Sequence, residues 1–192
     1  MIKEQLYELT VEDENVDGVF AISLVESPAI EMDFVYFGKD VKFSTIDNEK
    51  RLLMGPILVP DKKILRVDGA GQPYYVFFKP ETIKRLSELY LEKKLTDKAT
   101  LEHDKNIDGV NLVESWIVDD PKHDKQQVFG MDYPKGTWMV SMKILDDAIW
   151  QKVKDGKLNG FSVQGYFLEK AKFSKDNTET LEKIKDILKQ FV

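Results

Sequence analysis

The sequence contains no cysteine among its 192 residues. A disulfide framework, thiolate metal ligands and a cysteine nucleophile are therefore excluded, and the composition is compatible with a reducing compartment. Histidine is almost as scarce, because the chain has only His103 and His123. Any reaction that needs an imidazole as its general base must use one of these two residues.

Long apolar runs and stripes of positive charge are also missing. No run approaches the ~20 apolar residues that span a bilayer, and residues 1–17 are acidic without the basic start of a signal peptide. Lysines and acidic residues are interspersed, the net charge is -6, and no basic stripe could follow a phosphate backbone. We expect a soluble, intracellular protein that binds neither a membrane nor nucleic acid.

The apolar residues that are present favour one mainly β domain with flanking helices. A chain of 192 residues with 42% hydrophobic content can bury one core, and a second full domain is not expected. Short runs rich in β-branched and aromatic residues lie between turn-forming residues, at 34–37, 52–59, 74–78, 112–118, 137–144 and 161–168. Six or seven strands of this length can close a small β-barrel.

Two segments between these runs have helical spacing. Pro80 stands at a first helical position, and apolar residues recur at helical intervals from Ile83 to Tyr90. Asp146 or Asp147 can cap a shorter helix that ends at Gly156. We therefore expect two helices beside the sheet.

Residues 174–192 form a separate amphipathic segment beyond a main domain of residues 1–173. Their spacing predicts a helix with four apolar residues on one face: Leu181, Ile184, Leu188 and Phe191. A short helix is marginal alone in water and gains stability by burying its apolar face. We expect it to dock on its own domain, on a second copy of the chain as a homodimer, or on a partner protein.

His103 is the stronger candidate for a general base. His123 stands among polar and charged residues only, which favours a solvated loop histidine. His103 follows Ala99–Leu101 at an expected strand end, and residues 105–109 provide turn chemistry before the next strand. The same context also fits a hydrogen-bonded structural histidine.

Ser162 is the candidate nucleophile. In a strand, its hydroxyl would emerge on the face opposite Phe161, with Gly160 and Gly165 reducing the crowding around it. Because Gly165 stands three residues after the serine, the pattern is not the G-x-S-x-G nucleophile elbow. Together with His103, Ser162 predicts a serine hydrolase, and an ordinary serine in a glycine-spaced strand is the alternative.

Glu114 is the expected third group, which would orient the imidazole of His103. A tight hairpin closed by residues 105–110 would put His103 opposite Leu112 and Glu114 diagonally across the same face, ~7 Å away. Asp104 and Glu169 rank lower, because the first would point to the other face and the second is far along the strand. No metal or cofactor is expected, since neither histidine has a recognisable ligand spacing.

Five segments in order resemble one known family: residues 20–30 (FAISLVESPAI), 99–104 (ATLEHD), 113–118 (VESWIV), 136–139 (GTWM) and 159–167 (NGFSVQGYF). They are similar to the XkdF-like serine proteases of tailed phages, which belong with the prohead, or capsid maturation, proteases. The resemblance runs from about residue 19 to residue 169, which is most of the chain.

The resemblance implies a fold like that of herpesvirus assemblins, a closed, mostly antiparallel β-barrel ringed by helices. It also implies that His103 is the general base and Ser162 the nucleophile. The second histidine of the assemblins does not map onto this chain, because His123 precedes Ser162.

The implied substrates are phage scaffold and major capsid precursor proteins, and the protease itself, inside the immature prohead in the host cytoplasm. The alternative is a catalytically inactive capsid-assembly or scaffold-binding module with the same fold.

Overall fold

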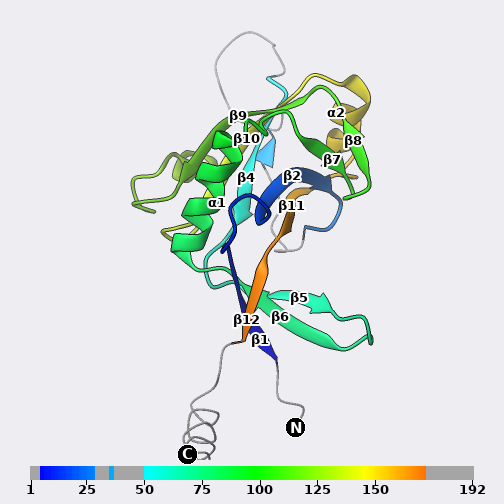
Figure 1. Cartoon of the computed structure of the whole chain (residues 1–192). Coiled ribbons are helices and arrows are strands. Elements are labelled where there is room, and N and C mark those ends of the chain that lie inside the picture. The colour runs from blue at the N-terminus through cyan, green and yellow to red at the C-terminus, as the bar shows by residue number, and fades with distance from the viewer. Residues whose placement is uncertain (1–4, 29–34, 37–49, 172–192) are drawn as a thin grey trace, which may run out of the picture.

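The computed structural model describes residues 5–28, 35–36 and 50–171 (Figure 1). Within these residues, twelve strands form three four-stranded sheets, accompanied by two α-helices and one 3-10 helix. The expected C-terminal helix of residues 174–192 lies outside the described residues.

The first sheet has the strand order β12-β1-β6-β5. Its strands are β1 (Leu6–Thr10), β5 (Ile64–Val67), β6 (Pro73–Phe77) and β12 (Leu168–Ala171). β1 pairs antiparallel with β12 and parallel with β6, so this sheet is mixed.

The second sheet is antiparallel throughout and has the order β3-β4-β10-β9. Its strands are β3 (Val35–Tyr36), β4 (Leu52–Leu58), β9 (Val110–Ile117) and β10 (Trp138–Ile144).

The third sheet has the order β11-β2-β7-β8 and is again mixed, because β2 and β7 run parallel. Its strands are β2 (Gly18–Val25), β7 (Ala99–Leu101), β8 (Lys105–Ile107) and β11 (Gly160–Tyr166). β11 and β12 follow one another in a single run down the molecule and so link the third sheet to the first (Figure 1).

Both expected α-helices are confirmed. α1 (Pro80–Glu92) begins at the predicted proline, and α2 (Asp147–Lys154) is capped by the Asp146 side chain, which accepts a hydrogen bond from the Ile149 N–H at 2.7 Å. The 3-10 helix η1 covers Lys125–Phe129. In the part of the chain that the structure describes, no helix has the length and apolar character needed to cross a membrane.

One hydrophobic core joins the three sheets and both helices. It contains Leu9 of β1, Ile22 of β2, Ile57 of β4, Ile83 of α1 and Trp150 of α2, all of which are buried. Each element therefore gains stability by removing apolar area from water in the same cluster.

The expectation of a closed, mostly antiparallel barrel is wrong. The mainly β composition with flanking helices holds, but within the described residues no sheet closes on itself, and two of the three sheets are mixed. The physical reason lies in two parallel pairs, β1 with β6 and β2 with β7, which join segments far apart in the chain. Alternation along a strand shows which residues share a face and does not show which strand will lie beside it.

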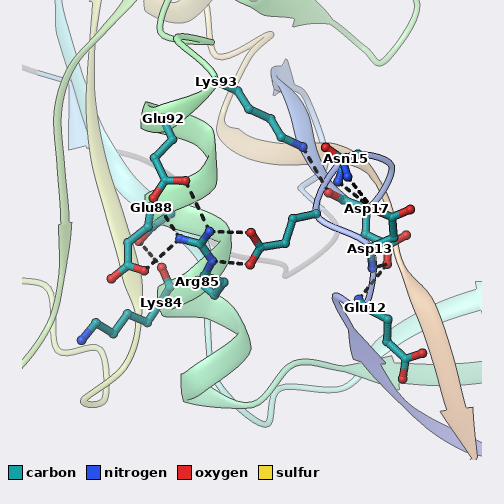
Figure 2. Close-up of polar contacts among 11 residues, drawn as sticks. Glu12, Asp13, Asn15, Asp17, Lys84, Arg85, Glu88, Glu92 and Lys93 are labelled. Atoms are coloured by element: carbon teal, nitrogen blue, oxygen red, sulfur yellow. Dashed lines mark hydrogen bonds and ion pairs between the residues drawn. The ribbon is translucent and has the colours of Figure 1, made fainter.

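A cluster of charges fixes the loop between β1 and β2 against α1 (Figure 2). Arg85 of α1 donates hydrogen bonds to both carboxylate oxygens of Glu14 at 2.6 and 2.7 Å, and it also pairs with Glu88 and Glu92. In the same loop, the Asp17 carboxylate accepts backbone N–H bonds at 2.8 and 3.1 Å, which lower its pKa. We call Arg85, Glu14, Glu88 and Glu92 the Arg85 cluster; it holds the segment that leads into β2.

Candidate active site

Three hydroxyl side chains form a row across neighbouring strands of the third sheet. Ser162 of β11 lies directly opposite Ser23 of β2, and Ser23 lies opposite Thr100 of β7. Directly opposed residues share one face of a sheet, with Cβ atoms about 4.5–5.5 Å apart across an antiparallel pair. The sheet therefore places Ser162 one strand away from Ser23 on the same face.

His103 lies at the tip of the turn that joins β7 to β8. The Asp104 N–H donates to the Leu101 carbonyl at 3.0 Å, and the two central residues of this turn, Glu102 and His103, have φ values of 50° and 61°. Two consecutive positive φ angles are the requirement of a type I′ turn, which glycine and asparagine normally fill. Strained backbone of this kind is concentrated at functional sites, where the surrounding contacts hold it.

Those contacts come from the hydroxyl row. The Nδ1 atom of His103 is 3.1 Å from the Oγ of Ser23, and the backbone N–H of His103 donates to the same oxygen at 3.2 Å. Ser23 also bonds to Thr100, whose hydroxyl donates to the Oε1 of Gln164 at 2.9 Å. The Gln164 Nε2 donates back to the His103 carbonyl at 2.7 Å. We call these four residues the Ser23 network; its hydrogen bonds fix both the ring and the backbone of His103.

The electrostatic surroundings of His103 favour its neutral form. Desolvation of the ring lowers its pKa below the ordinary histidine value; the nearby Glu102 carboxylate raises the pKa, and the Arg66 guanidinium lowers it. A neutral imidazole is the form that can accept a proton.

Ser162 is close to the surface yet largely covered, with 6% of its area exposed. It lines a small depression together with Arg66 and apolar residues that include Ile57, Ile64 and Phe161. The described structure gives the Ser162 hydroxyl no hydrogen-bond partner and gives Arg66 no ion pair. The hydroxyl, on the sheet face that Ser162 shares with Ser23, is thus not held by another group of the described protein.

Gly165 keeps Gln164 in its place in the network. The pairing of β11 with β2 shifts by one residue after Gln164, which is a β-bulge. A Cβ atom at Gly165 would lie 2.5 Å from the Gly18 carbonyl oxygen and 2.5 Å from the Phe167 ring. Only glycine fits between these groups without a shift of the strand.

The structure does not bring Glu114 to His103. The turn at residues 102–104 joins β7 to β8, and β9, which carries Glu114, belongs to the second sheet. There the Glu114 carboxylate pairs with Lys125 at 2.7 Å and accepts a hydrogen bond from Ser141, which together lower its pKa. Across the described residues, no hydrogen bond or ion pair joins Glu114 to His103.

In the described structure, the side chains of the remaining sequence candidates make no hydrogen bond or ion pair with the Ser23 network. The Glu169 carboxylate accepts a hydrogen bond from the Tyr74 hydroxyl at 2.9 Å in the first sheet. Asp104 is exposed at the end of the His103 turn. His123 is exposed in a loop, with its Nδ1 2.7 Å from Asp120.

Sequence reasoning missed the roles of Ser23, Thr100 and Gln164. Ser23 interrupts an otherwise apolar run at residues 19–25, and Thr100 lies between two apolar residues. Such polar interruptions are a signal that buried hydrogen bonds are needed, because a buried polar group without a partner is costly. The signal does not reveal that the two hydroxyls meet across β2 and β7.

Comparison with known proteins gives one match. A family model described as "Putative phage serine protease XkdF" matches residues 40–169. No curated protein and no solved structure matches the chain. The matched segment covers more than half of the chain and contains both His103 and Ser162, so the chain belongs to the phage protein family that this description names.

Proposed function

We propose that this protein is a serine endopeptidase in which Ser162 is the nucleophile and His103 the general base. Its substrates are the scaffold and major capsid precursor proteins of the immature phage head. The observation that carries the proposal is the hydroxyl row: Ser162 is one strand away from the serine that holds the His103 ring, on the same face of one sheet.

The arrangement supports acyl transfer. The Ser162 hydroxyl loses its proton to His103 while its oxygen bonds to the carbonyl carbon of a peptide. His103 returns that proton to the leaving amine as the C–N bond breaks. Water then attacks the acyl-enzyme, His103 accepts a proton from the water, and the proton returns to Ser162 when the acid product leaves.

Ser23 is the rival nucleophile, since its Oγ has the direct contact with the His103 ring. Its surroundings favour Ser162 instead. Ser23 is fully buried at 0% exposure and already bonds to both Thr100 and the His103 backbone, whereas Ser162 is 6% exposed and its hydroxyl has no hydrogen-bond partner in the described structure. A reaction at Ser162 breaks no hydrogen bond of the Ser23 network, whereas a reaction at Ser23 would.

Membership in a phage family supports a prohead substrate, and this part of the proposal can be tested directly. The protein is co-expressed with the scaffold and capsid precursors of the same phage, and new termini are mapped by mass spectrometry. We expect defined cleavage products with the wild-type chain and a loss on the order of 10³-fold or more with Ser162→Ala or His103→Ala.

Two matched variants serve as controls. Ser27 is an exposed serine outside the network, and His123 is the other histidine, so Ser27→Ala and His123→Ala should process the precursors normally. Full processing by Ser162→Ala would contradict the proposal. Absence of cleavage by every variant, with binding to scaffold retained, would identify an inactive assembly module instead.

A further inference from the structure

A histidine that accepts a proton from a serine at Nε2 must carry its own resting proton at Nδ1. In many serine proteases a carboxylate selects this tautomer by accepting a hydrogen bond from Nδ1–H. In the described structure the group at Nδ1 of His103 is a serine hydroxyl, which can either donate or accept. The tautomer therefore depends on where the Ser23 proton goes.

The orientation of the Gln164 side-chain amide determines the direction of its hydrogen bond with Thr100. Its amide contacts the His103 carbonyl oxygen at 2.7 Å, and a carbonyl oxygen can only accept. The NH₂ group of Gln164 must face that carbonyl, so its Oε1 faces Thr100 at 2.9 Å. The amide oxygen also only accepts, and the single hydroxyl proton of Thr100 is therefore donated to Gln164.

The direction of the next two hydrogen bonds follows from counting protons. Because the Thr100 proton is already used, the bond between Ser23 and Thr100 must be donated by Ser23. The Ser23 hydroxyl then has no proton left for the imidazole, and it must accept at its contact with Nδ1. We infer that the Ser23 network sets the Nδ1–H tautomer of His103 and leaves Nε2 free as the basic nitrogen.

Ser23, Thr100 and Gln164 are in this account positioning residues that act through His103. The backbone N–H of His103 donates to the same Ser23 oxygen, which fixes the ring and the turn together. When Nε2 takes up a proton, Nδ1–H continues to donate to Ser23, so no hydrogen bond of the network must be broken during the reaction. The catalytic meaning of the inference rests on the proposed function, whereas the tautomer itself does not.

The tautomer can be measured without any substrate. Two-bond ¹H–¹⁵N correlation spectra of the ¹⁵N-labelled protein distinguish a protonated ring nitrogen from an unprotonated one. The chain has only two histidines, so a His123→Asn background leaves the ring signals of His103 alone. At a pH well above the ordinary histidine pKa of ~6.5, we expect a protonated Nδ1 and an unprotonated Nε2.

Thr100→Val tests the network by removing the hydroxyl that links Ser23 to Gln164. Valine has nearly the shape of threonine without the hydroxyl, so Ser23 loses its acceptor and becomes able to donate to Nδ1. We expect the Nε2–H fraction to rise and kcat for precursor cleavage to fall on the order of 10-fold or more with little change in KM. Thr100→Ser restores a hydroxyl and should restore both the tautomer and kcat.

Thr137→Val is the matched control. Thr137 is fully buried, and its hydroxyl has no partner in the described structure, so the same change there removes no hydrogen bond. It should leave the His103 signals and kcat unchanged. The dispersion of amide signals reports whether each variant is folded.

An Nε2–H tautomer in the wild-type protein would overturn the inference, and so would an unchanged tautomer in folded Thr100→Val. The expected shift, reversed in Thr100→Ser, would support it. If these signals behave as expected but neither the wild-type protein nor any variant cleaves a precursor, the assigned tautomer stands and the proposed function fails.

Discussion

The Arg85 cluster and the Ser23 network hold neighbouring parts of the molecule by opposite means. The Arg85 cluster joins one cation on α1 to two carboxylates of the same helix and to Glu14 of the loop between β1 and β2, and all four side chains are partly or largely exposed (Figure 2). The Ser23 network joins neutral groups in a single file, with Ser23 and Thr100 buried in the third sheet. The Arg85 guanidinium has three carboxylate partners that can replace one another. In the Ser23 network, by contrast, each proton has a single acceptor.

This difference determines what each region can do. Exposed ion pairs are screened by salt and compensate for one another, so they hold a loop in place without fixing any proton. Neutral hydrogen bonds in single file fix a donor and an acceptor at each contact, and losing the buried one between Ser23 and Thr100 leaves a polar group without a partner. A site that needs one tautomer of one histidine is served by the second kind of contact.

Among substitutions outside the four residues of the Ser23 network, Gly165→Ala should disrupt that network most. The new methyl group would collide with the Gly18 carbonyl and the Phe167 ring, so β11 must move and carry Gln164 with it. We expect a loss of about 1–3 kcal/mol in the free energy of unfolding, measured with urea. Gly69→Ala, at a site with nothing within 4 Å, should leave stability unchanged or slightly higher. Equal stabilities for the two variants would show that the bulge does not fix β11.

Two substitutions, each of which removes one charge near His103, should move the pKa of His103 in opposite directions. Glu102 raises this pKa and Arg66 lowers it, so Glu102→Gln should lower the pKa and Arg66→Gln should raise it. Cleavage needs neutral His103 and is lost as pH falls through the pKa. The acidic limb of kcat/KM should therefore shift to lower pH in Glu102→Gln and to higher pH in Arg66→Gln. Shifts in the same direction, in activity or in NMR titration, would contradict this assignment.

Arg85→Gln and Arg66→Gln remove the same charge at two places, and we expect the first to change the melting temperature and the second to change the pKa of His103. Removing Arg85 separates Glu14 from α1, so the melting temperature should fall slightly, and the difference should shrink with added salt. The His103 pKa and precursor cleavage should stay at wild-type values. Arg66, without an ion pair in the described structure, should change the pKa of His103 and leave the melting temperature nearly unaltered. If Arg85→Gln moved the pKa, the two regions would not be independent.

Glu114→Gln should have the smallest effect on cleavage. The carboxylate pairs with Lys125 and accepts a hydrogen bond from Ser141 in the second sheet, away from His103. Its neutral isostere should therefore change kcat/KM by less than about 2-fold, as expected for a site that does not interact with the catalytic residues. A fall on the order of 10² would instead restore Glu114 as the group that orients His103. Steady-state kinetics on a peptide copied from a mapped cleavage site can decide between these results.

Local signals in the sequence were sufficient for the helices and for the setting of the two candidate residues. Pro80 and Asp146 mark helix starts because capping is decided by a few neighbouring residues, and both helices are confirmed. Ser162 does lie in a strand, and His103 does follow one. These features depend on alternation and on turn chemistry, which a short window of sequence contains.

Features that depend on distant pairing could not be predicted. Almost every side chain of β2 is buried, so the strand lacks the alternation that reveals half-exposed strands, and β7 and β8 are only three residues long. The expected tight hairpin is closed by residues 105–110, whereas the turn that carries His103 forms at 102–104 and joins β7 to β8, which removes the geometric reason for Glu114. The meeting of Ser23 with Thr100 and His103 depends on the parallel pairing of β2 with β7, for which the sequence has no local signal.

The most direct test of the account is to find which serine a fluorophosphonate modifies. The reagent loses fluoride and forms a bond from phosphorus to the oxygen of a serine that a neighbouring base activates. After labelling of the folded protein, digestion and mass spectrometry locate the phosphonylated residue. We expect the label on Ser162, its absence from Ser23, and its loss in His103→Ala and in unfolded protein. A label on Ser23, or labelling of Ser162 that does not depend on His103, would contradict it.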